Sequence, residues 1–184
     1  MATQPLLPLW LEQRVVSPDQ LPELMLQAEE TDSSACLQWH WENTDAVQLL
    51  RIADAPWTDA QKIEGLHQLP PLRGSAPMPP RSHTEVVGLL GPAAAELWGV
   101  VMPDLCRLLQ HRPHPFCSLA CQQLGGATQK AAVETSSFVH RNAEWKPWIT
   151  AAWTPGDAQG QRRSLAWLEA VWQILQPVCP GVHL

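Results

Sequence analysis

"SACLQWHWENTDAVQLLRIAD", residues 34–54, places two runs of alternating polar and apolar residues on either side of a turn signal. The first run, 34–43, has the period of two that is typical of a strand with one buried face. Residues 43–45 (Asn-Thr-Asp) supply the turn, and 46–54 has the pattern of a hairpin partner. The stretch therefore predicts two antiparallel strands.

Upstream of this hairpin, residues 9–16 have the pattern of a first strand and 17–30 that of a short amphipathic helix. Two starts are open for the helix. Ser17 and Gln20 can form a capping box, or Asp19 can be the N-cap, which would place Pro22 in the first turn, where its missing N–H costs little. The order strand, helix, strand, strand indicates an α+β fold, in which helices pack on one face of an antiparallel sheet.

The second half continues this pattern after a proline-rich connection at about 68–83, within one domain spanning 1–184. Residues 91–112 contain helical patches interrupted by Pro103. From 116 the sequence predicts a meander: a strand, a Gly125-Gly126 turn, a second strand to Arg141 and a third strand at 146–154. A closing helix at 157–177 has a predicted apolar stripe of Leu165, Leu168, Trp172 and Leu175.

Composition narrows the possible partners. The formal charge of −6 offers no basic patch for nucleic acid or an anionic membrane. The first residues have no basic region, prolines break their apolar run, and no stretch approaches the roughly 20 apolar residues that span a bilayer. Five scattered cysteines favour reduced, mostly buried thiols over a disulfide framework. We therefore expect a cytoplasmic protein.

Several kinds of active site are disfavoured by spacing. His111, His114, Cys117 and Cys121 superficially suit zinc, but residues 117 and 121 on a strand would lie about 13 Å apart, too far for two ligands of one ion. The sequence has no G-x-S-x-G elbow, no Gly-rich phosphate loop and no tyrosine. We therefore expect no metal site, no serine hydrolase and no nucleotide cradle within this chain.

The predicted second strand of the meander carries a His-Arg pair. With a period of two, Phe138 and His140 share one face, and Arg141 lies on the other. Two interpretations remain at this point: a site on the uncovered face of the sheet, or a sheet edge at which Arg141 pairs with Glu144 or with a helix end.

"GGATQKAAVETSSFVHRNAEWKPWITAAWTPGD" (125–157), followed by "RSLAWLEAVWQILQP" (163–177), resembles the C-terminal region of FAD-linked oxidases of the berberine bridge enzyme and 6-hydroxynicotine oxidase type, within the vanillyl-alcohol oxidase superfamily. The shared marks are a Gly-Gly-Ala turn, a Phe-x-His-Arg strand, a strand closing in Trp and a Trp-containing helix that ends near a Pro. The resemblance implies a sheet backed by helices, whose open face covers the flavin ring and forms the substrate pocket.

By this resemblance, His140, Phe138 and Glu134 would bind substrate, while Arg141 and the glycines at 125 and 126 would anchor the strand. FAD would be bound mainly by a separate domain or subunit, because nothing here corresponds to the family's FAD-binding domain. The chain would then be the substrate-binding (cap) portion of an oxidoreductase, inactive alone. The alternatives are a non-catalytic binding module descended from such a domain and, as a third class, a self-contained α+β enzyme.

Overall fold

The structure, a computed structural model, describes residues 10–30, 36–41, 46–53, 82–124 and 140–183. Its elements, in chain order, are β1 (Trp10–Val16), the short 3-10 helix η1 (Pro18–Gln20), α1 (Leu21–Glu30), β2 (Cys36–Trp41), β3 (Val47–Ala53), β4 (His83–Leu90), α2 (Ala95–Gln110), β5 (Ser118–Gln123), β6 (Trp145–Trp153), α4 (Ala158–Leu175) and β7 (Gly181–His183).

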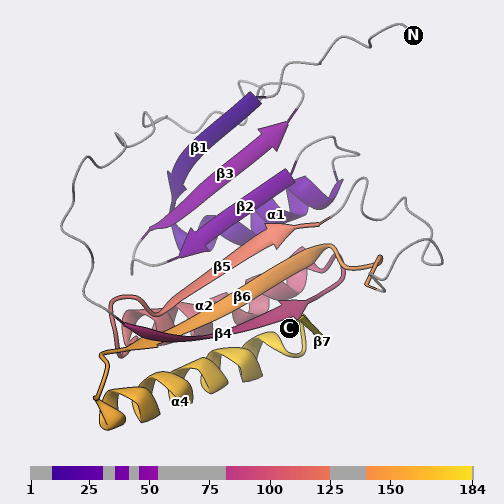
Figure 1. Cartoon of the computed structure of the whole chain (residues 1–184). Coiled ribbons are helices and arrows are strands. Elements are labelled where there is room, and N and C mark those ends of the chain that lie inside the picture. Colours follow the sequence, from indigo (N-terminus) through magenta and orange to yellow (C-terminus); the bar gives the residue numbers. More distant parts are fainter. Residues whose placement is uncertain (1–9, 31–35, 42–45, 54–81, 125–139, 184) are drawn as a thin grey trace, which may run out of the picture.

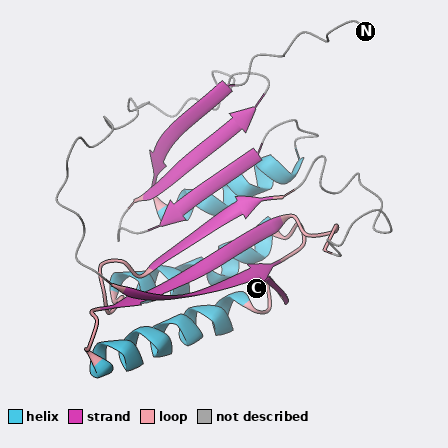
Figure 2. Ribbon diagram, in the orientation of Figure 1, coloured by secondary structure: helices cyan, strands magenta, loops and turns pink. Residues whose placement is uncertain are grey.

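The strands form a seven-stranded sheet in the order β1-β3-β2-β5-β6-β4-β7, and every pairing is antiparallel (Figure 1). Three α-helices among the described residues back this sheet, so the α+β prediction is confirmed. Figure 2 shows α1 and α2 behind the strands and α4 below β4 in the same view. None of the described helices is long and apolar enough to cross a membrane.

The hairpin predicted from 34–54 is present as β2 and β3. Trp39 pairs with Leu49, and His40 pairs with Gln48. Burial along β2 alternates between half-buried and buried, with Leu37, Trp39 and Trp41 on the covered side. This alternation follows from the period of two and leaves the remaining β2 side chains on the other face.

The start of the first helix agrees with the capping-box alternative, whereas Asp19 lies inside η1 and is not the N-cap. The Oε1 atom of Gln20 accepts a hydrogen bond from the backbone N–H of Ser17 at 3.1 Å, which belongs to a capping box. The box caps η1, and α1 follows directly, with Pro22 in its first turn. The two short elements together cover the β2 side of the core.

The core lies between the helices and one face of the sheet. Its largest fully buried side chains are Trp41, Trp98, Trp145, Leu21, Met25, Leu49, Leu89, Leu105, Leu109, Leu119, Ile149 and Leu175. Trp39 and Trp98 meet edge to face with ring centroids 5.6 Å apart. Helix α2 runs through Pro103 without a break, so the interruption expected there is wrong.

The buried side of α4 differs from the predicted apolar stripe. The buried side of α4 is formed by Ser164, Trp167, Leu168, Val171 and Leu175, whereas Leu165 and Trp172 are exposed. Because successive residues are about 100° apart on a helix, choosing Trp172 in place of Trp167 turned the expected stripe toward solvent.

The predicted three-strand meander is also wrong in its order, although most of its second strand lies outside the described residues. Strand β5 pairs directly with β6 and, on its other side, with β2, so no strand lies between β5 and β6. The third predicted strand is confirmed as β6, with Ile149 and Trp153 on the face opposite Trp148.

Candidate functional site

The face of the sheet opposite the helices is called the open face below, and strand register brings distant residues together on it. One row crosses four strands through Gln13, Leu50, Gln38 and Gln122. The next row crosses five strands through Val15, Gln48, His40, Ala120 and Trp148. Side chains of one row share a face, so residues from opposite ends of the chain form one surface.

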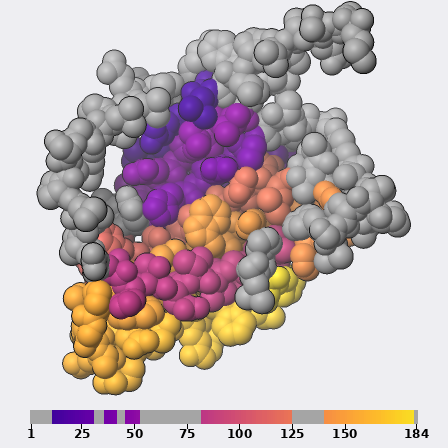
Figure 3. Space-filling view, viewed as in Figure 1, coloured from indigo at the N-terminus to yellow at the C-terminus, as the bar shows by residue number. Residues whose placement is uncertain are grey.

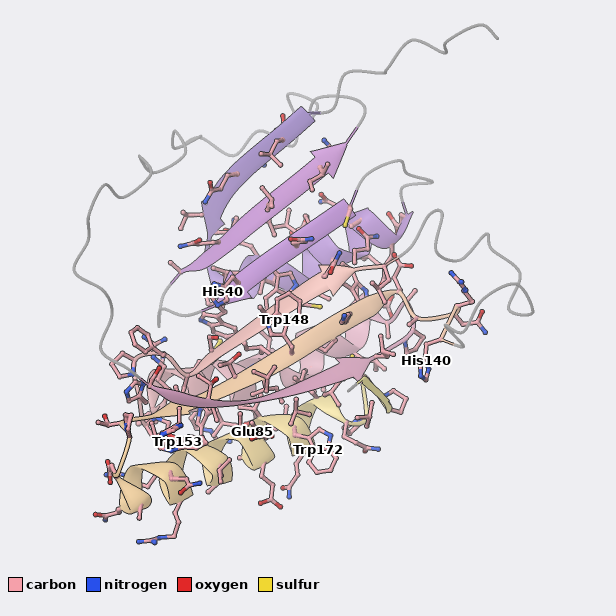
Figure 4. All side chains as sticks on the ribbon, viewed as in Figure 1. His40, Glu85, His140, Trp148, Trp153 and Trp172 are labelled. Atoms are coloured by element: carbon pink, nitrogen blue, oxygen red, sulfur yellow. The ribbon has the colours of Figure 1, made fainter. Side chains whose placement is uncertain are left out.

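A cavity of 490 Å³ lies on this open face, and it is called the hollow below. In Figure 4, His40 and Trp148 lie on the open face of the sheet. Figure 3 shows the same face in a space-filling view. The residues that line the hollow are Leu11, Gln13, Gln38, Trp39, His40, Gln48, Leu49, Leu50, Ala120 and Trp148. Its volume falls within the roughly 300–1,000 Å³ typical of small-molecule sites.

The hollow combines an apolar surface with neutral hydrogen-bonding groups. Of the described residues that line it, none is Asp, Glu, Lys or Arg. Among the described residues, no side-chain hydrogen bond engages the amides of Gln13, Gln38 and Gln48. Each amide carries two N–H donors and a carbonyl acceptor, so the hollow offers several hydrogen bonds to a ligand.

Polar groups on the helix side of the sheet are used differently. The Nε2 atom of Gln123 donates to Glu144 Oε1 at 2.6 Å and to the carbonyl of Ala28 at 3.1 Å, and its Oε1 accepts from the backbone N–H of Leu37 at 3.1 Å. This amide ties α1, β2 and the start of β6 together. Its role is to hold the fold.

The N-termini of α2 and α4 are also occupied by the chain's own side chains. Glu29 Oε1 accepts from the backbone N–H groups of Ala94 (2.8 Å) and Ala95 (3.0 Å), where α2 begins, and from Trp145 Nε1 (2.5 Å). Asp157 Oδ1 accepts from the backbone N–H of Gly160 at 2.8 Å, where α4 begins. Since these amides are the groups that would bind a phosphate, neither helix start is open to one.

The described thiols are poor nucleophiles. Burial raises the pKa of Cys179 to about 12, and burial is also the main cause that raises the pKa of Cys121. Cys117 donates weakly to the carbonyl of Ala152 at 3.7 Å. All five cysteines are free, and no group of three His, Cys, Asp or Glu residues that could hold a metal occurs in the described part of the chain.

His140 lies elsewhere. It is exposed, it precedes the turn that leads into β6, and it does not line the hollow. Figure 4 shows it beyond the end of β6, away from His40. Arg141 follows it, half-buried in the same turn. Phe138, Glu134, Gly125 and Gly126 lie outside the described residues, so the substrate-binding and anchoring roles stay predictions.

The residues of the hollow escaped the sequence prediction, although one signal for them was available. In "CLQWHW" (36–41), Gln38 and His40 alternate with large apolar residues, so both lie opposite the core. That pattern alone places them on a face that the core does not use. It does not show that strands β1, β5 and β6 add further residues beside them.

Comparisons with known proteins found matches in structure only. No protein-family profile matches the sequence. No curated protein matches it either. Among experimentally determined structures, berberine bridge enzyme from Eschscholzia californica superposes with a TM-score of 0.58 and 13% identity over 93% of this chain and 41% of that one.

Two further structures agree with this likeness. GilR, described as an oxidoreductase that catalyzes the terminal step of gilvocarcin biosynthesis, has a TM-score of 0.61 and 14% identity over 92% of this chain and 42% of its own. BBE-like 1 from Physcomitrella patens has a TM-score of 0.64 and 9% identity over 93% of this chain and 44% of its own. The chain thus spans less than half the length of these proteins, and it has the fold of part of an FAD-linked oxidase of the berberine bridge enzyme type.

Proposed function

We propose that this chain is the substrate-binding portion of an FAD-linked oxidoreductase and that its open face covers a flavin held by another domain or subunit. The observation that carries the proposal is the hollow on the uncovered face of an antiparallel sheet whose other face is closed by helices. The likeness to oxidase structures supports the same assignment at the level of fold.

The residues present fit one part of FAD and not the other. The ring system of FAD is flat, and Trp148 and the apolar side chains of the hollow offer it a surface, which leaves the neutral amides for a substrate. The diphosphate needs unpaired backbone N–H groups or cationic side chains. The starts of α2 and α4 are already bonded to Glu29 and Asp157, so the diphosphate would be bound by the partner.

FAD, when bound, supplies a hydride acceptor for a substrate C–H next to oxygen or nitrogen. The chain's own residues would bind and orient that substrate. Gln13, Gln38 and Gln48 would hydrogen-bond it, and Trp148 would bound its far side. The apolar side chains Leu11 and Leu50 would exclude water from the reacting carbon when the partner closes the hollow.

The test is to purify the chain alone and then together with the polypeptide encoded directly upstream, and to record the visible absorption spectrum of each. We expect flavin absorption only in the co-purified sample. Colourless samples from both preparations of a folded chain would contradict the proposal. Flavin bound by the chain alone would contradict the assignment of the diphosphate to a partner.

A matched pair of variants locates the contact. Val86 on β4 is 54% exposed on the open face, and Val100 on α2 is 75% exposed on the helix side. Val86→Glu should prevent co-purification of the flavin-binding chain, because it buries an unpaired charge in the contact. Val100→Glu should leave co-purification unchanged.

A non-catalytic binding module remains the second candidate. Leu11 and Val15 on β1 are exposed, and they lie on the same open face of the sheet as Val86. Exposed apolar residues in such positions also fit a protein partner that contains no flavin. A stable complex that contains no flavin would favour this candidate. The cytoplasmic location expected from the sequence is part of either proposal, and fractionation of cells would test it.

A further inference from the structure

We propose that two copies of this chain associate through strand β1, edge to edge, so that one antiparallel sheet continues from one copy into the other. The inference goes beyond the proposed function, because it concerns the edge of the sheet and not the face that would cover a flavin. It is carried by the length and composition of β1 and by the match of this strand with its own copy.

The two edges of the sheet differ in their protection against such pairing (Figure 1). Strand β7 forms one edge with only three residues, and Pro180 precedes it. Strand β1 forms the other edge with seven residues, and within the described part of the chain it pairs with β3 alone. Natural sheets protect their edges with very short strands, Lys or Pro, and β1 contains neither Lys nor Pro. The β1 edge is therefore the one suited to accept a further strand.

Two apolar side chains of β1 are exposed beside this edge. Leu11 is 57% exposed and Val15 is 47% exposed, and both lie on the open face. An adjacent antiparallel strand places the Cβ atom of each directly opposite residue about 4.5–5.5 Å away. A strand added at this edge would therefore cover both side chains, and it would have to present apolar groups to them.

A second copy of β1 presents such groups in one register. A two-fold axis perpendicular to the sheet keeps the helices of both copies on one side, so that each residue faces one from the same side of the sheet. An axis through Gln13 places Leu11 opposite Val15 of the second copy, and Glu12 opposite its Arg14. Apolar side chains then meet on the open face, and opposite charges meet on the helix side.

The neighbouring registers of the same symmetry are unfavourable. An axis through Glu12 would place two carboxylates opposite each other, and an axis through Arg14 would do the same with two guanidinium groups. Like charges directly opposite each other destabilise a pair of strands. Glu12 also contacts Arg51 of its own chain at 3.4 Å, so the axis through Gln13 places this carboxylate between two cations. Strand β1 is thus complementary to itself about Gln13 and about neither neighbour.

The association would also extend the hollow. Leu11 and Gln13 line the hollow, and Val15 of the second copy would lie beside Leu11. Because the axis is perpendicular to the sheet, the open faces of both copies point to the same side. Each copy would thus form part of the rim of the other copy's hollow.

The first test is sedimentation velocity of the full chain alone over a series of concentrations. We expect a species of twice the mass of one chain, whose fraction rises with concentration. Leu11→Lys and Val15→Glu should each weaken the dimer by about tenfold, because a charge replaces an apolar group at two symmetric contacts. The double variant Leu11→Lys/Val15→Glu should associate more tightly than either single variant, since the new ammonium and carboxylate groups face each other.

A matched control and a folding check accompany these variants. Val100→Lys introduces the same charge at a position on α2 that is 75% exposed, and it should leave the dimer unchanged. Circular dichroism of every variant checks that it is folded.

Disulfide crosslinking tests the position of the axis. The Cα atoms of directly opposite residues in antiparallel strands are about 4.5–5.5 Å apart, which a disulfide spans. Gln13→Cys should therefore give a covalent dimer when the purified chain is treated with diamide. Gln48→Cys, exposed on the same face of β3, should not. The unaltered chain, whose five cysteines are free, gives the background.

A monomer at every concentration up to about 1 mM would overturn the inference. A dimer that Leu11→Lys leaves intact, or that Val100→Lys weakens equally, would overturn it as well, because the contact would then lie elsewhere. A double variant no tighter than the single ones, or no crosslink through Gln13→Cys above that of Gln48→Cys, would contradict the register and with it the inference.

Discussion

The two faces of the sheet use the same residue types in opposite ways. Gln123, on the helix side, uses its amide to bond Ala28, Leu37 and Glu144, and it is buried. Gln38, on the open face, lines a cavity. Successive side chains of a β-strand point to opposite faces of the sheet. Residue type alone therefore does not distinguish a polar group that holds the fold from one that is available to a ligand.

Two tryptophans of β6 give the largest expected difference in stability between the two faces of the sheet. Trp145 is fully buried and its Nε1 donates to Glu29, whereas Trp148 is half-buried on the open face. Trp145→Ala should lower the free energy of unfolding by about 3–5 kcal/mol, and Trp148→Ala should lower it by much less. Urea unfolding followed by circular dichroism measures both, and equal losses would show that the open face also carries the fold.

Two glycines should respond in opposite directions. A Cβ on Gly91 would lie 2.5 Å from Cys179 Sγ and 2.8 Å from the carbonyl oxygen of Val178. Gly91→Ala should therefore destabilise the protein by about 1–3 kcal/mol. A Cβ on Gly99, within α2, would meet nothing closer than 3.7 Å, so Gly99→Ala should stabilise by about 0.4–1 kcal/mol. Thermal unfolding gives the sign, and a neutral Gly91→Ala would contradict the close packing of Gly91 against Cys179.

Two glutamates adjacent in the sequence test how much helix capping contributes to stability. Glu29 caps the start of α2 and accepts from Trp145, while Glu30 is exposed. Glu29→Ala should cost about 0.5–2 kcal/mol of stability, and Glu30→Ala less than about 0.5 kcal/mol. The same pair of variants measured by urea unfolding checks this difference. Equal effects would remove Glu29 from its assigned role.

The smallest effect concerns alkaline pH. Burial raises the pKa of Cys179 from 9.0 to about 12, so its stabilising contribution is complete below pH 9 and is lost as the pH rises from 9 toward 12. Between pH 8 and pH 10, the unaltered chain should lose about 1 kcal/mol more stability than Cys179→Ala does. Parallel losses in the two proteins would show that this thiol ionises in the folded state as it does in the unfolded chain.

Local periodicity explains what could be predicted from sequence. The hairpin of β2 and β3, the two sides of β6 and the α+β class follow from alternation and helix signals over short stretches. The order of the strands in the sheet could not be predicted in this way. Strand β5 lies beside β2, which is more than seventy residues away in sequence, and only tertiary packing selects that partner.

The candidate site was less predictable than the fold for the same reason. The resemblance drew attention to His140, which lies in a turn, whereas the hollow combines Gln13, His40 and Trp148 from three separate strands. Each of these residues is ordinary in its own stretch. Their proximity depends on the registers of β1 with β3, β3 with β2, β2 with β5 and β5 with β6.

The most direct test of the central claim is hydroxyl-radical footprinting of Trp148 and Trp172 in the chain alone and in complex with its flavin-binding partner. Trp148 lies on the open face and Trp172 on the outer side of α4 (Figure 4). We predict that the complex protects Trp148 from oxidation and leaves Trp172 as reactive as before. Protection of Trp172 with no change at Trp148 would place the partner on the helices and contradict the account.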